Sequence, residues 1–326
     1  MLGNDGWDSI AFHHPVLFRT GAWMRAFRFQ IPFKKPVLLK GRIYEGRQGV
    51  LLERNGQWAE ASPLPGFSLE TVDDVVASLR GKQKPPASLR FALSALNEPL
   101  AASISVPYNF LLLGDSDKIA DRAIDCQLSK CKAVKMKVGQ GSLESDIQLV
   151  KEVREALPDK IQLRLDANQS WEFEEAVFFI ESLKDLDYQY IEEPLRDPLR
   201  IEELFQLTGV NYAIDESLVQ NDCLDPWPNA AALICKPTLL GGRSAVEKLA
   251  LSGKPIVFSA AFESGVGIMR IMQLAAEFSP RVPAGLDTLA WLANDVLKEP
   301  LQKEDGLLTT PRQIDVNAIE LEEVLL

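Results

Sequence analysis

Charged residues recur at regular intervals along the middle of this 326-residue chain, and each closes a short apolar run. Successive positions lie 21 to 29 residues apart, with helix-like segments between them. One βα unit has about that length, so the charged side chains fall at the carboxyl ends of successive parallel strands. In a (β/α) barrel those ends meet at one mouth, where such barrels carry their active sites. The positions are Lys135 and Lys137, Asp166, Glu192, Asp215 and Lys236.

The surrounding region alternates strand-like and helix-like segments and has no repeat at the period of a solenoid. Parallel strands need such crossovers, and seven or eight in succession favour a closed barrel over an open sheet. We therefore expect an α/β fold with a (β/α) barrel over residues 103–290. The expected strands are 106–113, 132–138, 161–167, 188–193, 211–215, 232–236 and 255–260, and the expected helices are 116–129, 142–157, 172–185, 199–208, 241–252 and 264–278.

A different pattern precedes the barrel and predicts a small α+β domain over residues 24–102. Strand-like alternation up to residue 52, broken at Gly41, Gly46 and Gly49, indicates an antiparallel meander. A loop punctuated by proline and glycine is expected at 58–68, with Ser68 as the cap of the next helix. A second helix is expected within 85–102, because proline stands at its start and an apolar stripe comes after it.

The two ends of the chain are expected to lie outside these units. Residues 1–23 show no clear period, contain both histidines, and look like an extension or leader. Met24 would be a natural start for the rest of the chain. Residues 291–326 are less regular, and we expect them to pack back on the first domain.

Composition excludes several classes of partner. The net charge of −11 argues against nucleic acid or an anionic membrane as the main partner. No apolar run is long enough to span a bilayer, and the N-terminus lacks the apolar core of a signal peptide. The four cysteines have no metal-finger spacing, which favours reduced, mostly buried thiols in a cytoplasmic protein. A small molecule is therefore the expected partner, and the oligomeric state stays open.

Strand parity indicates which side chains point into the barrel, because successive side chains alternate faces. Lys135 and Lys137 share one face of their strand, and apolar neighbours occupy the other. Three carboxylates without histidine or cysteine nearby form an oxygen-only site that suits Mg²⁺, or Mn²⁺, rather than zinc. Flanking lysines suit removal of a proton next to a substrate carboxylate, with the cation stabilising the resulting enediolate.

Each of these motifs also has a plain structural explanation. A Lys-x-Lys pair is usually a solvated strand edge, and Asp-x-Asn more often caps a turn. Glu-Glu-Pro and Asp-Glu-Ser are common charge arrangements before a helix. The whole set in barrel order at βα spacing favours an active site over five separate coincidences. No Walker or Rossmann phosphate loop and no Gly-x-Ser-x-Gly elbow points to a different chemistry.

Together the motifs resemble the enolase superfamily in its muconate-lactonizing-enzyme branch. Finer motifs resemble the o-succinylbenzoate synthases of menaquinone biosynthesis: residues 61–71 (ASPLPGFSLET), 164–168 (RLDAN), 213–217 (AIDES) and 285–288 (GLDT). The resemblance covers residues 24–326 and leaves the first 23 unmatched. It implies a modified (β/α)7β barrel of the TIM type with an N-terminal α+β capping domain, and Mg²⁺ dependence.

The resemblance also implies roles for the residues of the mouth. Asp166, Glu192 and Asp215 would be the Mg²⁺ ligands, and Glu192 is preferred to Glu193 because its parity matches an inward position. Lys137 would be the base that removes the proton α to the substrate carboxylate and then protonates the departing hydroxyl. Two further lysines would assist: Lys236 by stabilising the enediolate, and Lys135 by tuning Lys137 and contacting the carboxylate.

Further positions are implied around these groups. Arg164 and Asn168 would orient the ligands. Family members often have more serines where Ala260 and Ala261 stand, which leaves the contact to the substrate tail open at that point. The residues expected to hold the tail are Ser259, Glu263, Ser264 and Gly265. Gly285 and Leu286 are expected to contact the substrate or to support the groups that do. Pro65, Gly66 and Phe67 are expected to form a lid over the mouth.

The implied reaction is a syn-dehydration of 2-succinyl-6-hydroxy-2,4-cyclohexadiene-1-carboxylate to o-succinylbenzoate. The main alternative is an epimerase or racemase of dipeptides or N-acylamino acids, which needs two lysines on opposite faces of its substrate. This chain has both lysines, so they do not separate the two activities. A histidine base is excluded because both histidines precede residue 15. A catalytically silent barrel used for binding would lack a ligand or a lysine, and none is missing.

Overall fold

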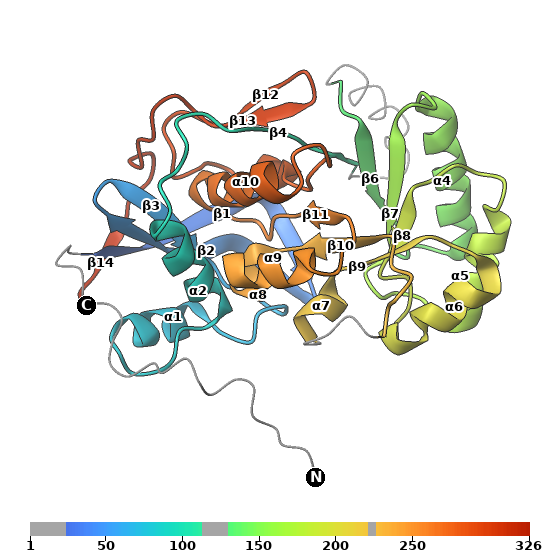
Figure 1. The fold of residues 1–326 in the computed structure, drawn as a ribbon, viewed down its shortest axis with the longest axis horizontal. Helices are drawn as coiled ribbons and strands as arrows, with labels where there is room; N and C mark the ends of the chain where they lie inside the picture. Colours follow the sequence, from blue (N-terminus) through green and yellow to red (C-terminus); the bar gives the residue numbers. More distant parts are fainter. Residues whose placement is uncertain (1–23, 113–129, 221–225) are drawn as a thin grey trace, which may run out of the picture.

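The structure is a computed structural model that describes residues 24–112, 130–220 and 226–326. An antiparallel sheet with two helices lies beside a curled parallel sheet wrapped by further helices (Figure 1). The expected leader, residues 1–23, and the helix expected at 116–129 lie outside the described residues.

The antiparallel sheet has the strand order β14-β1-β2-β3, and with helices α1 and α2 it forms the capping domain. Its core consists of small and branched side chains such as Val50, Leu52 and Val76, which are buried between the sheet and the two helices. The C-terminal strand β14 pairs antiparallel with β1, so the C-terminal segment is part of this domain. The bounds are β1 Arg25–Leu39, β2 Arg42–Arg54, β3 Gln57–Ala61, α1 Val72–Leu79, α2 Ala87–Leu96 and β14 Glu322–Val324.

Three expectations for this domain were wrong in detail, and the first concerns its glycines. Gly41 lies in the β1–β2 turn, but Gly46 and Gly49 lie inside β2. A Cβ on Gly46 would meet Ile31 O at 2.6 Å, and one on Gly49 would overlap the Ser62 hydroxyl. The two glycines thus permit close packing and do not break the strand.

The loop and the helix cap also differ from expectation. The residues from Trp58 to Ala61 belong to strand β3, so the irregular loop begins only at Ser62. Thr71, not Ser68, caps α1, because Thr71 and Asp74 form a reciprocal capping box. The Ser68 hydroxyl instead accepts the Leu64 N–H at 2.8 Å and closes the loop.

The parallel sheet has the order β11-β10-β9-β8-β7-β6-β5. The segment Ala284–Gly285 joins its two edges: Ala260 N donates to Gly285 O, and Asn109 N donates to Ala284 O, both at 2.9 Å. This segment takes the place of an eighth strand, and the predicted (β/α)7β barrel is confirmed. The strands are β5 Phe110–Leu112, β6 Ala133–Lys137, β7 Gln162–Asp166, β8 Tyr190–Glu192, β9 Tyr212–Ile214, β10 Ala232–Cys235 and β11 Ile256–Phe258.

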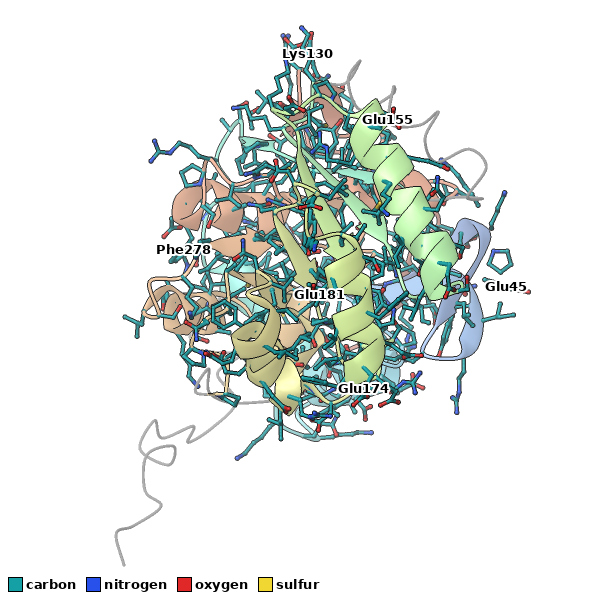
Figure 2. The ribbon with its side chains drawn as sticks, turned by 90° about the vertical axis from the view of Figure 1, so that its right-hand side faces the viewer. Glu45, Lys130, Glu155, Glu174, Glu181 and Phe278 are labelled. Atoms are coloured by element: carbon teal, nitrogen blue, oxygen red, sulfur yellow. The ribbon has the colours of Figure 1, made fainter. Side chains whose placement is uncertain are left out.

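Helices cover the outside of the barrel, and their apolar faces meet the outward side chains of the strands. Alternate residues of β7 and β10, such as Leu163, Leu165 and Leu233, belong to the large core beneath these helices. Figure 2 shows α4 and α5 with Glu155 and Glu174 on their solvent side. The helices are α4 Leu143–Ala156, α5 Phe173–Ser182, α6 Ile201–Thr208, α7 Glu216–Gln220, α8 Pro237–Leu240, α9 Arg243–Ala250 and α10 Gly265–Phe278, with 3-10 turns at Pro198–Arg200 and Asp287–Trp291.

Two expected barrel elements have different bounds in the structure. The strand expected at 106–113 is two strands, because β4 (Ser105–Pro107) pairs antiparallel with β13 while β5 pairs with β6. The helix expected at 241–252 begins only at Arg243, because Gly241 and Gly242 have φ values of 99° and 89° that end the short helix α8.

The C-terminal residues supply β14 to the antiparallel sheet and also form a third, three-stranded sheet with β4. Strands β12 (Gln302–Glu304) and β13 (Leu307–Thr309) form a hairpin that extends to β4. No described helix is long and apolar enough to cross a membrane.

Candidate active site

The strand registers place the charged residues in neighbouring positions at one end of the barrel. Lys137 pairs with Asp166, and Asp166 pairs with Glu192, across β6, β7 and β8. Asp215 and Lys236 are the first residues after β9 and β10. We call Lys135, Asp166, Glu192, Asp215 and Lys236 the mouth cluster.

Apolar side chains from four strands also face the interior below this cluster. Tyr190, Ala213, Ile234 and Val257 form a separate buried core inside the barrel. Glu192 lies two residues beyond Tyr190, and Lys236 two residues beyond Ile234, so both share that inward face. Glu193 has the opposite parity, which agrees with the choice of Glu192 as the inward carboxylate.

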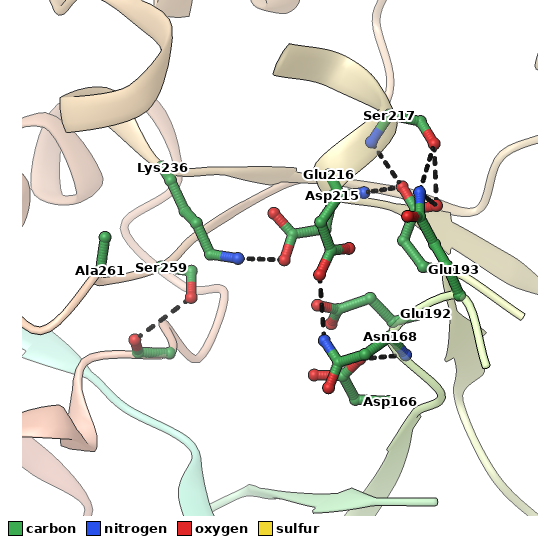
Figure 3. A network of polar contacts seen from close by, with 12 residues as sticks. Asp166, Asn168, Glu192, Glu193, Asp215, Glu216, Ser217, Lys236, Ser259 and Ala261 are labelled. Atoms are coloured by element: carbon green, nitrogen blue, oxygen red, sulfur yellow. Dashed lines mark hydrogen bonds and ion pairs between the residues drawn. The ribbon is translucent and has the colours of Figure 1, made fainter. Parts of the chain in front are cut away.

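Lysine–carboxylate pairs hold the mouth cluster together. Lys135 Nζ lies 2.8 Å from Asp166 Oδ2 and 2.7 Å from Glu192 Oε1. Lys236 forms an ion pair with Asp215 on the other side (Figure 3). All three carboxylates are at most 3% exposed. Buried carboxylates need such partners, because burial without compensation strongly disfavours their charged form.

These contacts fix the charge states of the two lysines. Burial alone would lower the pKa of Lys135, but Asp166 and Glu192 outweigh it and raise that pKa well above its ordinary value. Burial would likewise lower the pKa of Lys236, but Asp215 and Glu216 outweigh it and raise that pKa. Both pKa shifts favour the charged form of these side chains in this arrangement.

Lys137 differs from its neighbours. Within the part of the chain that the structure describes, its ammonium group makes no hydrogen bond or ion pair, although its charge helps to hold the pKa of Asp166 down. Lys137 at the end of β6 and Lys236 directly after β10 stand on opposite sides of the mouth. Three positions of the ring separate them in either direction: β7, β8 and β9 one way, and β11, Ala284–Gly285 and β5 the other.

The three carboxylates have the donor chemistry of a divalent-cation site. Burial and the nearby charge of Asp166 raise the pKa of Glu192 well above its ordinary value, even though Lys135 opposes that rise. An additional cation would relieve this repulsion, and oxygen donors suit Mg²⁺. In residues 24–112, 130–220 and 226–326, no three acidic, histidine or cysteine side chains converge closely enough to hold an ion. In this structure the Lys135 ammonium supplies the positive charge beside Asp166 and Glu192.

Two acidic residues that the sequence did not single out support the cluster. Glu193 accepts hydrogen bonds from Asp215 N at 2.8 Å and from Ser217 N at 2.9 Å, and so fixes the turn that carries Asp215 (Figure 3). Glu216 is buried beside Asp215, and burial followed by that charge raises the pKa of Glu216 to about 7. Their positions within Glu-Glu-Pro and Asp-Glu-Ser were visible in the sequence, but their partners were not.

The two residues expected to orient the ligands lie in different places. Asn168 donates its backbone N–H to Asp166 Oδ1 at 3.1 Å and its side-chain amide to Glu216 Oε1 at 3.0 Å. Arg164 lies two residues deeper in the barrel, below Asp166. Its guanidinium donates to the side chains of Gln189 and Asn109 and to the carbonyl of Pro283, and none of these acceptors is a ligand carboxylate.

The residues expected to hold the substrate tail or otherwise contact the substrate fall into two groups. Ser259 and Gly285 lie together on neighbouring strand positions, where a Cβ on Gly285 would meet Ser259 Oγ at 2.9 Å. The others are buried and already have internal partners: Glu263 accepts from Ala261 N, Ser264 contacts Glu60, Gly265 N donates to Asp295, and Leu286 is fully buried.

The expected lid lies beside the mouth cluster. Gly66 and Phe67 line a small cavity of about 50 Å³ together with Asp215, Glu216 and Lys236. Pro65 precedes them in the same partly exposed turn. Lys40, from the β1–β2 turn, lies over the Phe67 ring at 5.1 Å and lines the same cavity. The capping domain thus contributes one wall of the site.

Comparisons with known proteins agree with this architecture. Residues 118–314 match the family described as "Enolase C-terminal domain-like", and residues 22–89 match "MenC, N-terminal domain". The o-succinylbenzoate synthase of Yersinia pseudotuberculosis is 31% identical over 87% of this chain and 95% of its own length. That of Haemophilus influenzae is 30% identical over 83% of this chain and 91% of its own.

Solved structures show the same fold at lower identity. The L-Ala-D/L-Glu epimerase of Bacillus subtilis superposes with a TM-score of 0.76 at 19% identity, covering 92% of this chain and 98% of that one. The o-succinylbenzoate synthase of Thermosynechococcus elongatus, solved with Mg in its active site, gives 0.72 at 23% identity over 86% and 96%. The chain therefore belongs to the enolase superfamily and, within it, to the o-succinylbenzoate synthase family of enzymes.

Proposed function

We propose that this enzyme dehydrates 2-succinyl-6-hydroxy-2,4-cyclohexadiene-1-carboxylate to o-succinylbenzoate, with Lys137 as the base. The observation that carries the proposal is the contrast among three lysines at one mouth. Lys135 and Lys236 are bound to carboxylates, while Lys137 has no such partner among the described residues. A proton-transfer group must be accessible and unengaged, and Lys137 is the lysine that meets this condition.

In the proposed reaction, Lys137 accepts the proton from the carbon α to the ring carboxylate. The electron pair of that C–H bond delocalises into the carboxylate and then forms the new ring double bond as the C–O bond to the hydroxyl breaks. The proton on Lys137 passes to the departing hydroxyl, which leaves as water. One amine on one face serves both transfers, which accounts for a syn elimination.

The other residues of the mouth cluster would stabilise charge. Lys236, across the mouth from Lys137, stays cationic and faces the negative charge that develops on the substrate. Asp166, Glu192 and Asp215 would hold Mg²⁺, with Asn168 and Glu193 fixing the orientation of two of them. When bound, the cation supplies positive charge that neutralises the substrate carboxylate and stabilises the enediolate.

The test is turnover of the purified enzyme with the cyclohexadiene substrate and Mg²⁺, beside Lys137→Ala and a chelated sample. We expect metal-dependent formation of the aromatic product, and a fall in kcat of about 10⁴-fold in Lys137→Ala, the upper range for loss of a general acid–base. Wild-type activity that survives in Lys137→Ala would contradict the assignment of the base. Mg²⁺ binding by the variant would show that its site is intact.

A second activity has a specific observation in its favour. Lysines on opposite sides of the mouth suit removal and return of a proton on opposite faces, as an epimerase or racemase requires, and epimerases share this fold. Exchange of the α-proton of dipeptides or N-acylamino acids in deuterated water measures this activity. Exchange without dehydration of the cyclohexadiene would move the assignment to epimerase and leave the site unchanged.

A further inference from the structure

A second group of buried charges lies between the capping domain and the barrel, outside the mouth cluster. Arg47 on β2 is 2% exposed, and Glu60 on β3 and Glu263 before α10 are fully buried. We call these three residues the interdomain cluster. A Cβ on Gly267 would meet Glu263 Cβ at 2.5 Å and Glu60 Oε2 at 3.0 Å, so the two acids flank the first turn of α10. Charges are rarely buried without a role, because their desolvation is costly.

Arg47 holds the loop that forms the wall of the active site. Its guanidinium donates to the carbonyl of Pro63 at 2.5 Å and to the carbonyl of Ser62. Residues 62–67, which we call the capping loop, continue from these carbonyls to Gly66 and Phe67 beside Asp215 and Lys236. Arg47 therefore fixes the first residues of the capping loop. It binds their main-chain carbonyls, so this contact does not depend on the side chains of the loop.

Glu60 joins the capping domain to the turn between β11 and α10. Its carboxylate accepts the N–H groups of Ser264 at 3.1 Å and Gly267 at 3.0 Å, and also the hydroxyl groups of Ser264 and Ser62. A carboxylate at this place caps the N-terminus of α10 from another domain. The capped turn comes after Ser259, which follows the C-terminal end of β11 and lies next to Gly285.

Glu263 completes the connection on the barrel side. It accepts the Thr238 hydroxyl at 2.5 Å and the Ala261 N–H at 2.6 Å. Thr238 stands two residues after Lys236, in the first turn of α8. The interdomain cluster thus touches three segments that surround the mouth: the capping loop, the β11–α10 turn and the segment after Lys236.

We propose that Arg47, Glu60 and Glu263 are positioning residues that hold the capping loop and the β11–α10 turn in the geometry the reaction needs. None of the three touches the mouth cluster, so they act through the segments that they bind. The part of the inference that concerns catalysis rests on the proposed dehydration, whereas the part that concerns the loop does not. Removal of one of these hydrogen-bonding side chains should loosen the capping loop before it unfolds the protein.

The experiment compares the wild type with Glu60→Gln, which keeps the shape but loses the charge. Amide hydrogen exchange is followed at Leu64, Phe67 and Ser68, whose N–H groups are hydrogen-bonded within the loop. We expect exchange there to accelerate at least about 10-fold. With Mg²⁺ saturating, kcat/KM should fall about 100-fold, the scale expected when reacting groups are misplaced by about 1 Å. Mg²⁺ affinity should stay unchanged, because the proposed ligands lie on other strands.

Asp295→Asn is the matched control. Asp295 also accepts an N–H of the β11–α10 turn, that of Gly265 at 2.8 Å, but it comes from the C-terminal segment and makes no hydrogen bond with the capping loop, which lies wholly within the described residues. The control should leave exchange in the loop at its wild-type rate. Equal release of the loop in both variants would overturn the inference, because a weakened α10 cap would then explain everything.

Two further outcomes separate this inference from the proposed function. If the wild type shows no dehydration, the proposed function fails, yet the exchange rates still decide whether the cluster holds the loop. If Glu60→Gln does not fold, Arg47→Lys takes its place, since a lysine keeps the charge but cannot serve both carbonyls in the same way. Unchanged exchange and unchanged kcat/KM in a folded variant would overturn the inference.

Discussion

The mouth cluster and the interdomain cluster are both buried and both charged, but their charges are compensated differently. In the mouth cluster, lysines pair directly with carboxylates, as Lys135 does with Asp166 and Glu192. In the interdomain cluster, the hydrogen-bond partners of the charges are neutral dipoles: carbonyls for Arg47, and N–H and hydroxyl groups for Glu60. The two regions solve the same desolvation problem in two ways.

This difference in hydrogen-bond partners means that the charges of the mouth cluster can change partners, whereas those of the interdomain cluster keep theirs. An ammonium on a flexible lysine stem can withdraw when a competing cation or an anionic substrate arrives. Backbone N–H and carbonyl groups cannot withdraw without local unfolding. In the mouth cluster the lysine that compensates each buried carboxylate can therefore be replaced by another cation. In the interdomain cluster the dipoles that compensate the buried charges are fixed in place. Substitutions in the two clusters can test this distinction, from the largest expected effect to the smallest.

Lys135→Met should have the largest effect on stability, and Mg²⁺ should reverse it. Removing the ammonium leaves Asp166 and Glu192 buried without their cation, which costs about 3–5 kcal/mol when one partner of a buried pair is lost. Urea unfolding without Mg²⁺ measures this loss. With saturating Mg²⁺, the difference from the wild type should shrink, because the cation compensates the same carboxylates. A loss that Mg²⁺ does not reduce would show that compensation at the mouth is not replaceable.

The mouth cluster was largely predictable from sequence, because its information is local. Each charged residue lies at or near the end of an apolar strand, and parity places Asp166 and Glu192 of the cluster, and Lys137 beside them, on the inward face. The pairing of neighbouring parallel strands then places Lys137, Asp166 and Glu192 side by side. Sequence could not show that Lys135 and Lys236 are engaged and Lys137 is not, since that depends on side-chain contacts across several strands.

The interdomain cluster was not predictable, because the contacts of Glu60 with the start of α10 join residues about 200 positions apart. Glu60 looked like part of an irregular loop, and Glu263 like a contact for the substrate tail. In the structure, Glu60 lies in β3 and binds Ser264, and Glu263 has no exposed surface. The strand at 106–113 failed for a similar reason: the pairing of β4 with β13 involves the C-terminal segment, which no local pattern indicates.

The free energy of unfolding should also depend on pH because of Glu60 in the interdomain cluster, and Glu60→Gln should remove this dependence. Burial raises the pKa of Glu60 to about 7 from an ordinary value of 4.5, against the lowering effect of hydrogen bonds from Ser264 and Ser62. Between these two pH values the folded protein binds more protons at Glu60 than the unfolded chain does. The contribution of Glu60 is therefore largest below about pH 4.5 and is lost as pH rises through about 7, by up to about 3 kcal/mol.

The measurement is the free energy of unfolding of the wild type minus that of Glu60→Gln, from urea titrations between pH 4.5 and 8. Glu216, whose pKa is also raised to about 7, titrates in both proteins and cancels in the difference. The other charges that face Glu60 are Arg47 and Glu263, and they too are present in both. A difference that does not vary with pH would show that Glu60 keeps one protonation state throughout this range.

Ser62→Ala should have the smallest effect and should be independent of Mg²⁺. The Ser62 hydroxyl is buried and donates to Glu60, so its removal deletes one of several neutral donors. We expect a loss of about 1 kcal/mol in the free energy of unfolding. The pKa of Glu60 should rise further, because that hydrogen bond favours the carboxylate, so the pH dependence of stability should move to higher pH. In a Glu60→Gln background the same substitution should cost less, because the two residues act on one another. An equal loss in the free energy of unfolding in both backgrounds would mean that Ser62 does not stabilise the Glu60 charge. It would contradict the idea that fixed dipoles compensate the charges of the interdomain cluster.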